Sequence, residues 1–217
     1  MIVKCRELAK NIYLVKFQSK KQLAKTFLRF QEHFESPKFR KKVFKLSEFK
    51  EWYVKNSPAG IRTGKFTYYK DWGGFNIPSK VLEPFYRGKF NPLTREEKIL
   101  LGLFKSFRRK NFYIIAIHDK SGKHTLQHEI AHGLFYTNPR YKKAVIGILK
   151  KCDKNSREEI NKFLLNRGGY HPDVWMDETH THIMTDMSYL KRHGVNTKKL
   201  SGINKELNNV FKRYFKR

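Results

Sequence analysis

Apolar side chains recur every three or four residues in several segments of this chain, as they do in amphipathic helices. The first segment follows Ser19-x-x-Gln22, a capping signal, continues through Leu23 and Phe27, and ends before Pro37. The same spacing predicts helices after Ser47 and Thr94, over about 125–136, 141–151 and 157–165 (capped by Ser156), from Pro172 to about Lys191, and over 204–215.

Strand patterns are fewer than helical ones. Residues 112–117 (Phe-Tyr-Ile-Ile-Ala-Ile) form the clearest, a continuous apolar run. Residues 65–70 predict a second strand, 71–74 its turn and 75–77 a short returning partner, whereas 56–60 predict a loop. We therefore expect an α+β fold that is predominantly helical with a small sheet.

Charge is the most unusual bulk property of the chain. Its 217 residues carry 47 Lys+Arg and 19 Asp+Glu, a net charge of +28. Residues 1–90 carry 21 basic and 7 acidic side chains and 91–217 carry 26 and 12, so each part is +14. Such a surface attracts nucleic acid or other polyanions. Aromatic and basic residues alternate in 39–44, 104–110 and 211–217, where the rings either stack on bases or belong to the core.

Cys5 and Cys152 are the only cysteines, and we expect two reduced thiols rather than a disulfide framework. No stretch approaches the ~18 apolar residues of a membrane helix. The first residues also lack the apolar run of a secretory signal. We therefore expect a cytoplasmic protein without a transmembrane segment. No pattern indicates its oligomeric state.

Residues 128–132 form the motif H-E-x-x-H on a predicted helix. Residues four apart lie on one helix face, so the imidazoles of His128 and His132 can bind one ion. Glu129 then lies beside the metal, where it can hold the attacking water. The bare motif also occurs by chance, but here an apolar strand precedes it and eight of the nine histidines fall between 118 and 193.

A catalytic Zn²⁺ site needs a third protein ligand and an open position. The densest group of ligand types downstream is Trp175-Met-Asp-Glu-Thr-His-Thr-His182, on a helix that concentrates acids in a basic protein. We choose Glu178 as the third metal ligand. Its rivals are Asp177, His180, His182 and His171, and either Glu178 or His182 is able to orient the other by hydrogen bonding.

The motif followed by a glutamate on a later helix resembles the gluzincin clan of zinc metallopeptidases. Over residues 110–190, the strand, the helix Thr125-Leu-Gln-His-Glu-Ile-Ala-His-Gly and the later Asp177-Glu-Thr-His-Thr-His-Ile-Met resemble the small ImmA/IrrE-like members. The gap from His132 to Glu178 is longer than in the smallest members. His182 stands where the thermolysin pattern has an aspartate, and no third histidine of the SprT/Spartan-like kind follows Gly133.

The resemblance implies a zincin-like catalytic domain over residues 93–217, with an active-site helix and a glutamate-bearing second helix. Residues 1–92 would form a basic N-terminal helical and hairpin region packed on it, in one continuous globular unit. The implied function is zinc-dependent hydrolysis of a protein or peptide substrate, with Glu129 as the general base.

The resemblance also implies that strand 112–117 offers an edge to an extended peptide. Candidates for stabilising the oxyanion are Tyr170, His171, Tyr189 and His193. Residues 72–76 (Trp-Gly-Gly-Phe-Asn) either line the cleft or merely form a hairpin turn.

Two functions compete with the peptidase hypothesis. The first is a strongly basic nucleic-acid-binding protein with a structural or vestigial zinc site. The second is a zinc hydrolase acting on another bond, although the H-x-E and P-C-x-x-C pair of nucleobase deaminases is absent.

Overall fold

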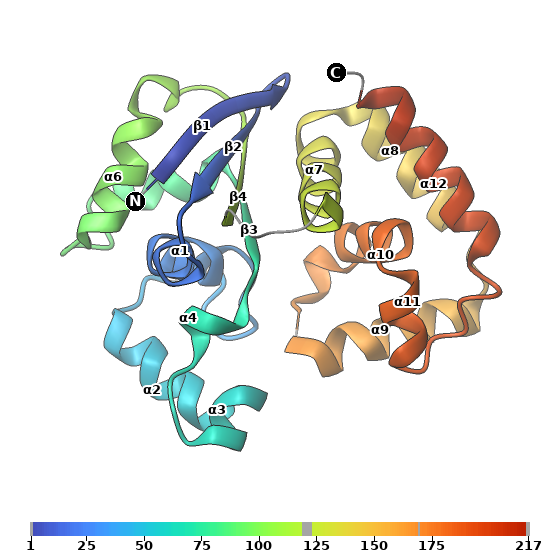
Figure 1. Ribbon diagram of the computed structural model, residues 1–217, viewed down its shortest axis with the longest axis horizontal. Helices are drawn as coiled ribbons and strands as arrows, with labels where there is room; N and C mark the ends of the chain where they lie inside the picture. Colours follow the sequence, from blue (N-terminus) through green and yellow to red (C-terminus); the bar gives the residue numbers. More distant parts are fainter. Residues whose placement is uncertain (1, 119–122, 169, 216–217) are drawn as a thin grey trace.

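The computed structural model describes residues 2–118, 123–168 and 170–215. A four-stranded sheet lies between two groups of helices (Figure 1). Its strands are β1 (Ile2–Ala9), β2 (Ile12–Phe17), β3 (Gly74–Pro78) and β4 (Tyr113–His118). The spatial order is β1-β2-β4-β3; β2 and β4 are parallel and the outer pairs antiparallel. The expected α+β fold, mostly helical with a small sheet, is confirmed.

Strand β4 is buried on both faces, which explains its unbroken apolar sequence. Tyr113, Ile115 and Ile117 belong to one apolar cluster, whereas Ile114 and Ala116 belong to a second. The sheet therefore separates two cores, and each needs its own layer of helices.

One layer comes from the first half of the chain and packs on the face of Ile114 (Figure 1). It contains α1 (Lys20–Glu35), α2 (Leu46–Asn56), α3 (Pro58–Thr63), α4 (Tyr68–Asp71), η1 (Ser79–Leu82), α5 (Glu83–Tyr86), α6 (Arg95–Leu103) and η2 (Lys105–Phe107).

The second layer follows β4 in the chain and packs on the face of Ile115 (Figure 1). It contains α7 (Lys123–Thr137), α8 (Pro139–Leu149), α9 (Lys154–Gly168), η3 (Pro172–Val174), α10 (Trp175–Thr185), α11 (Met187–Arg192) and α12 (Ser201–Tyr214).

Capping signals locate the starts of two helices correctly. The Ser19 hydroxyl accepts a hydrogen bond from the Gln22 amide (3.3 Å) before α1, and Thr94 accepts one from the Glu97 amide (3.2 Å) before α6. Glu97 accepts a return bond from the Thr94 amide (2.8 Å), which completes a capping box. Helices are also confirmed after Ser47 and over 125–136, 141–151 and 204–215, with ends shifted by a few residues.

Two predictions between residues 56 and 70 are wrong. The supposed loop at 56–60 enters α3, because the Ser57 hydroxyl caps the Gly60 amide at 2.9 Å and Pro58 occupies the first turn. The supposed strand at 65–70 contains the start of α4. The Tyr53 hydroxyl donates to Asp71 and shares a second hydrogen bond with the Thr67 hydroxyl, and these contacts hold the helix in place. Strand β3 consequently pairs with β4 instead of that segment.

The N-terminal hairpin was not predicted, and two helix limits differ. Strands β1 and β2 meet at a tight turn where Asn11 has a φ of 63°. Helix α9 begins at Lys154 because Asp153, rather than Ser156, caps it: the Ser156 amide donates to Asp153 Oδ1 at 3.0 Å. The long helix predicted to Lys191 is interrupted at Asp186, between α10 and α11.

Most aromatic rings of the basic segments belong to the core. Phe39, Phe44, Phe104 and Phe211 are buried, so these four rings are not exposed for stacking on bases. Both cysteines are free thiols, as expected. None of the helices in the described ranges has the length and apolar character needed to cross a bilayer.

A buried ion pair joins helix α1 to the capping box at the start of helix α6. Arg29 of α1 donates through Nε to Glu97 Oε1 at 2.7 Å, and also to the carbonyls of Phe90 (2.9 Å) and Pro92 (3.1 Å). Arg29 is 5% exposed and Glu97 is 1% exposed. Removing one partner therefore leaves the other charge buried and uncompensated.

Replacing Arg29→Met is accordingly expected to lower the free energy of unfolding by about 3–5 kcal/mol, measured by urea titration. Arg87→Met is the matched control, because the Arg87–Glu83 pair is largely exposed and its loss should leave the midpoint nearly unchanged. Equal midpoints for Arg29→Met and the native protein would contradict this role of the buried pair.

Candidate metal centre

Helix α7 carries the H-E-x-x-H motif and packs against β3, β4 and α10. His128 and His132 lie one turn apart, as the spacing predicts, with their Nε2 atoms 3.2 Å apart. Two nitrogens at about 2.0–2.1 Å from a tetrahedral zinc ion are separated by about 3.3–3.4 Å. The two nitrogen atoms are therefore close enough together to contact one ion.

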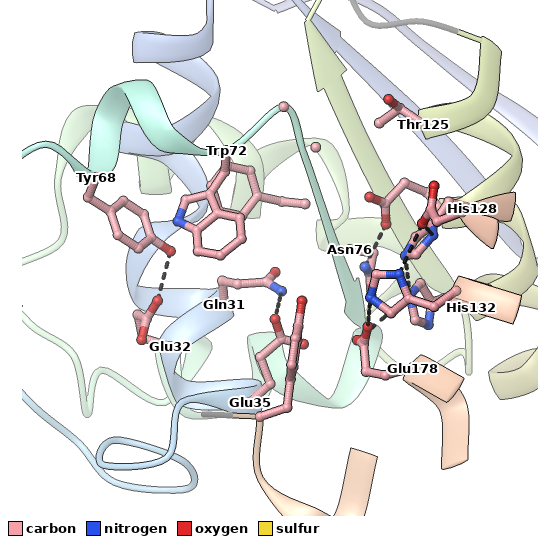
Figure 2. Close-up of a pocket in the computed structure, with 17 residues that line it drawn as sticks. Gln31, Glu32, Glu35, Tyr68, Trp72, Asn76, Thr125, His128, His132 and Glu178 are labelled. Atoms are coloured by element: carbon pink, nitrogen blue, oxygen red, sulfur yellow. Dashed lines mark hydrogen bonds and ion pairs between the residues drawn. The ribbon is translucent and has the colours of Figure 1, made fainter. Parts of the chain in front are cut away.

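Helix α10 brings Glu178 to the same point, although 45 residues separate it from the motif (Figure 2). Glu178 Oε1 lies 3.7 Å from His132 Nε2, and Glu178 Oε2 lies 3.7 Å from His182 Nε2. Ligand atoms of His128, Glu178 and His182 also lie within 4.8 Å of one another. The structure thus brings together the three predicted ligands and one of the rivals, His182.

Carboxylates face the other nitrogen of each imidazole. Asp186 Oδ2 lies 3.1 Å from His128 Nδ1 and 3.0 Å from His182 Nδ1, and Asp177 Oδ1 lies 3.0 Å from His132 Nδ1. Such outer carboxylates orient imidazole ligands in zinc sites and increase their basicity. Asp186, the residue between α10 and α11, therefore faces one imidazole from each of the two helices α7 and α10.

Burial favours a neutral His132 but opposes ionised carboxylates, because it raises the pKa of Asp177 to about 7. Burial and the neighbouring His128 lower the pKa of His132 to about 3, so this imidazole is neutral at physiological pH. Burial raises the pKa of Asp186, but the hydrogen bonds from His128 and His182 outweigh it and leave this pKa well below its usual range. Neutral imidazoles beside an ionised carboxylate are the form that ligates zinc.

Strand β3 holds Glu129 in position. Asn76 Nδ2 donates to Glu129 Oε2 at 2.5 Å, and the Tyr113 hydroxyl donates to Asn76 Oδ1. A Cβ atom on Gly74 would approach Glu129 Oε1 to 2.9 Å, so glycine leaves room for the carboxylate. Glu129 is 7% exposed and consequently has one defined orientation.

These residues line a cavity of about 280 Å³. Residues 72–76 all line this cavity, which is one of the two roles that the sequence suggested for them. The other role, a hairpin turn after a strand at 65–70, is wrong because β3 pairs with β4 instead. The opposite wall comes from α1, through Gln31, Glu32 and Glu35 (Figure 2). Sequence analysis missed this wall, because acids on an amphipathic helix look like a solvated face.

The rivals His180 and His171 are not among the residues that line the cavity. His180 is fully buried and stacks on Phe135 at 5.1 Å, and His171 is half-buried beside Asp173. Of the oxyanion candidates, Tyr170 lines the cavity. Tyr189 and His193 pack together at 4.2 Å beside a separate cavity.

The expectation of a free edge on strand 112–117 is wrong. β4 pairs with β2 on one side and β3 on the other, because its apolar residues require the centre of the sheet. The edge strand at the cavity is β3, which has no second partner strand among the described residues. Comparison with protein-family models, curated proteins and solved structures finds no match to this chain.

Glu32, on the cavity wall formed by α1, should make the stability of the fold depend on pH. Burial raises the pKa of Glu32 to about 7, from an ordinary value of 4.5, although the Tyr68 hydroxyl donates to it. Between these values the folded protein keeps a proton that the unfolded chain loses. The contribution of Glu32 to the free energy of unfolding is therefore fully present below pH 4.5 and is lost as the pH rises toward 7.

In metal-free protein, Glu32→Gln should melt at the native temperature near pH 4 and at an increasingly higher temperature than the native protein up to about pH 7. Thermal melts across this range measure the difference. The control Glu51→Gln removes an exposed carboxylate and should show no such divergence. Parallel melting curves for Glu32→Gln and the native protein would rule out a buried, protonated Glu32.

Proposed function

We propose that this chain is a zinc-dependent peptidase of gluzincin type, with His128, His132 and Glu178 as zinc ligands. The observation that carries the proposal is the 3.2 Å approach of the two Nε2 atoms beside Glu178, in a cavity that also contains Glu129. Imidazole and carboxylate donors suit zinc, and three of them leave one position open.

When bound, zinc supplies a Lewis acid that acidifies water and polarises a carbonyl group. Glu129 supplies the proton transfer: it takes a proton from the attacking water and passes it to the leaving amine. Its hydrogen bond from Asn76 keeps one carboxylate oxygen occupied and fixes the other, so Asn76 is a positioning residue.

Strand β3 supports a peptide as the substrate. It forms the edge of the sheet, and its residues 74–76 line the cavity beside Glu129. An extended peptide can add to such an edge through backbone hydrogen bonds, which would align the scissile bond with the motif helix. Tyr170, which also lines the cavity, is the remaining candidate donor to the oxyanion.

Glu129→Gln tests the role of the general base. The variant should retain about one zinc per chain, because Glu129 is not a ligand, while hydrolysis of a quenched peptide pool falls by about 10²–10⁴-fold. Zinc content is measured by elemental analysis, with His128→Ala and Glu178→Ala as variants expected to lose the metal. Salt-sensitive nucleic-acid binding unaffected by Glu129→Gln, with no cleavage of any peptide, would instead favour the nucleic-acid hypothesis.

His182 decides whether the site is open, because a fourth protein ligand would close it and make the metal structural. We expect His182 to orient Glu178 and to leave the fourth position free. Cobalt-substituted native protein should then change its visible spectrum when acetohydroxamate is added, and His182→Ala should respond similarly. A response in His182→Ala alone would show that the native site is closed and would remove the peptidase proposal.

A further inference from the structure

The wall of the cavity opposite the imidazoles has no role in the hydrolytic chemistry. It consists of Gln31, Glu32 and Glu35 on α1, with Tyr68 and Trp72 from the α4 segment (Figure 2). Since the two walls share one cavity, a peptide held at the metal centre would place a neighbouring group against this second wall.

The residues that line the cavity are acidic, in contrast to the basic composition of the protein. Its acidic lining residues are Glu32, Glu35, Glu129, Glu178 and Asp186, and none of the described lining residues is Lys or Arg. The chain as a whole has a net charge of +28. This concentration of acids therefore does not reflect the overall composition.

The two α1 carboxylates have only neutral partners within the described residues. The Tyr68 hydroxyl donates to Glu32 Oε1 at 2.8 Å, and Gln31 Nε2 donates to Glu35 Oε1 at 2.6 Å. Burial raises the pKa of both carboxyls, and for Glu35 the nearby charges of Glu32 and Glu129 add to the effect. A bound cation would offset both the desolvation of the ionised carboxylates and the repulsion between them.

Gln31 independently indicates a missing donor. Its side chain is 7% exposed, and its Oε1 atom has no hydrogen-bond partner. In this orientation Nε2 donates to Glu35 Oε1, and Oε1 of Gln31 is the atom left unsatisfied. An unpaired buried acceptor is unfavourable, so a ligand that donates a hydrogen bond to Oε1 would be stabilised at this wall.

Two aromatic rings complete the wall. The rings of Tyr68 and Trp72 lie 6.4 Å apart at the cavity, and aromatic faces attract cations. Trp72 Nε1 also lacks an acceptor. A basic residue within a peptide would bring a cation for the carboxylates and a backbone carbonyl for this N–H group.

We propose that Gln31, Glu32 and Glu35 form a specificity subsite for the ammonium or guanidinium group of a peptide substrate. The inference rests on the proposed peptidase function for its substrate class. The cation has two sources with the same chemistry, a lysine or arginine side chain and a peptide N-terminal amine.

The first experiment compares cleavage of quenched peptides that differ at one position near the scissile bond. Lysine or arginine should raise kcat/KM by about 10–100-fold over norleucine or glutamate, the range for a charge-assisted hydrogen bond. Glu35→Gln and Glu32→Gln should remove most of this preference, and Glu35→Lys should reverse it toward glutamate. The exposed-surface variant Glu51→Gln should keep it.

The second experiment measures binding without cleavage, by calorimetry on the metal-free full chain. N-acetyl-lysine amide should bind at least about tenfold more tightly than N-acetyl-norleucine amide, and Gln31→Leu and Glu35→Gln should abolish the difference. Leucine amide carries only an α-amine, so preferential binding of leucine amide would assign the subsite to the peptide N-terminus.

The outcomes separate the two proposals. Cation-selective binding that depends on Glu35, with no peptide hydrolysed, supports the subsite and contradicts the peptidase function. Hydrolysis without preference for a basic residue, together with cation binding unchanged in Glu35→Gln, overturns the subsite alone. Loss of a second bound zinc ion in Glu35→Gln would show that the wall holds a metal and would also overturn the subsite.

Discussion

The burial of β4 on both faces determines how the rest of the molecule is arranged. Six consecutive buried residues cannot face water on either side, so each face of the sheet carries a layer of helices. β3 is then the edge strand, with α1 and α7 packed against it. The cavity at this edge is consequently lined from both layers, with metal-ligand candidates on one wall and α1 carboxylates on the other.

The second core contains buried polar side chains that pair with one another only in part. His132, Glu178 and His182 are each at least 96% buried, beside a large cluster of apolar side chains. Asp186 serves two imidazoles, and Asp177 faces a third. Buried polar groups without partners would destabilise this packing. A site built on two packed helices also holds its donors more rigidly than a site on loops.

The part of the site that was predictable depends on local spacing. Helical periodicity places His128 and His132 on one face, and the unusual acids on a later helix single out Glu178. The contact of Asp186 with His128 joins two helices that are far apart in the sequence, and it has no local sequence signal. The hairpin of β1 and β2 was missed because exposed charged residues, Lys4, Arg6 and Glu7, interrupt the apolar pattern of β1. The strand predicted at 65–70 failed because tertiary hydrogen bonds from Tyr53 select a helical turn.

The basic exterior and the acidic cavity act over different ranges. At physiological ionic strength exposed charges are screened beyond about 8 Å, so the surface charge weakly opposes a single cation already inside the cavity. Buried carboxylates are screened much less and act at contact distance. In the proposed peptidase, the cavity would therefore select a basic residue at one subsite, while the outer surface would attract acidic segments of the same substrate. The two fields together would favour a substrate of mixed charge over a uniformly basic one.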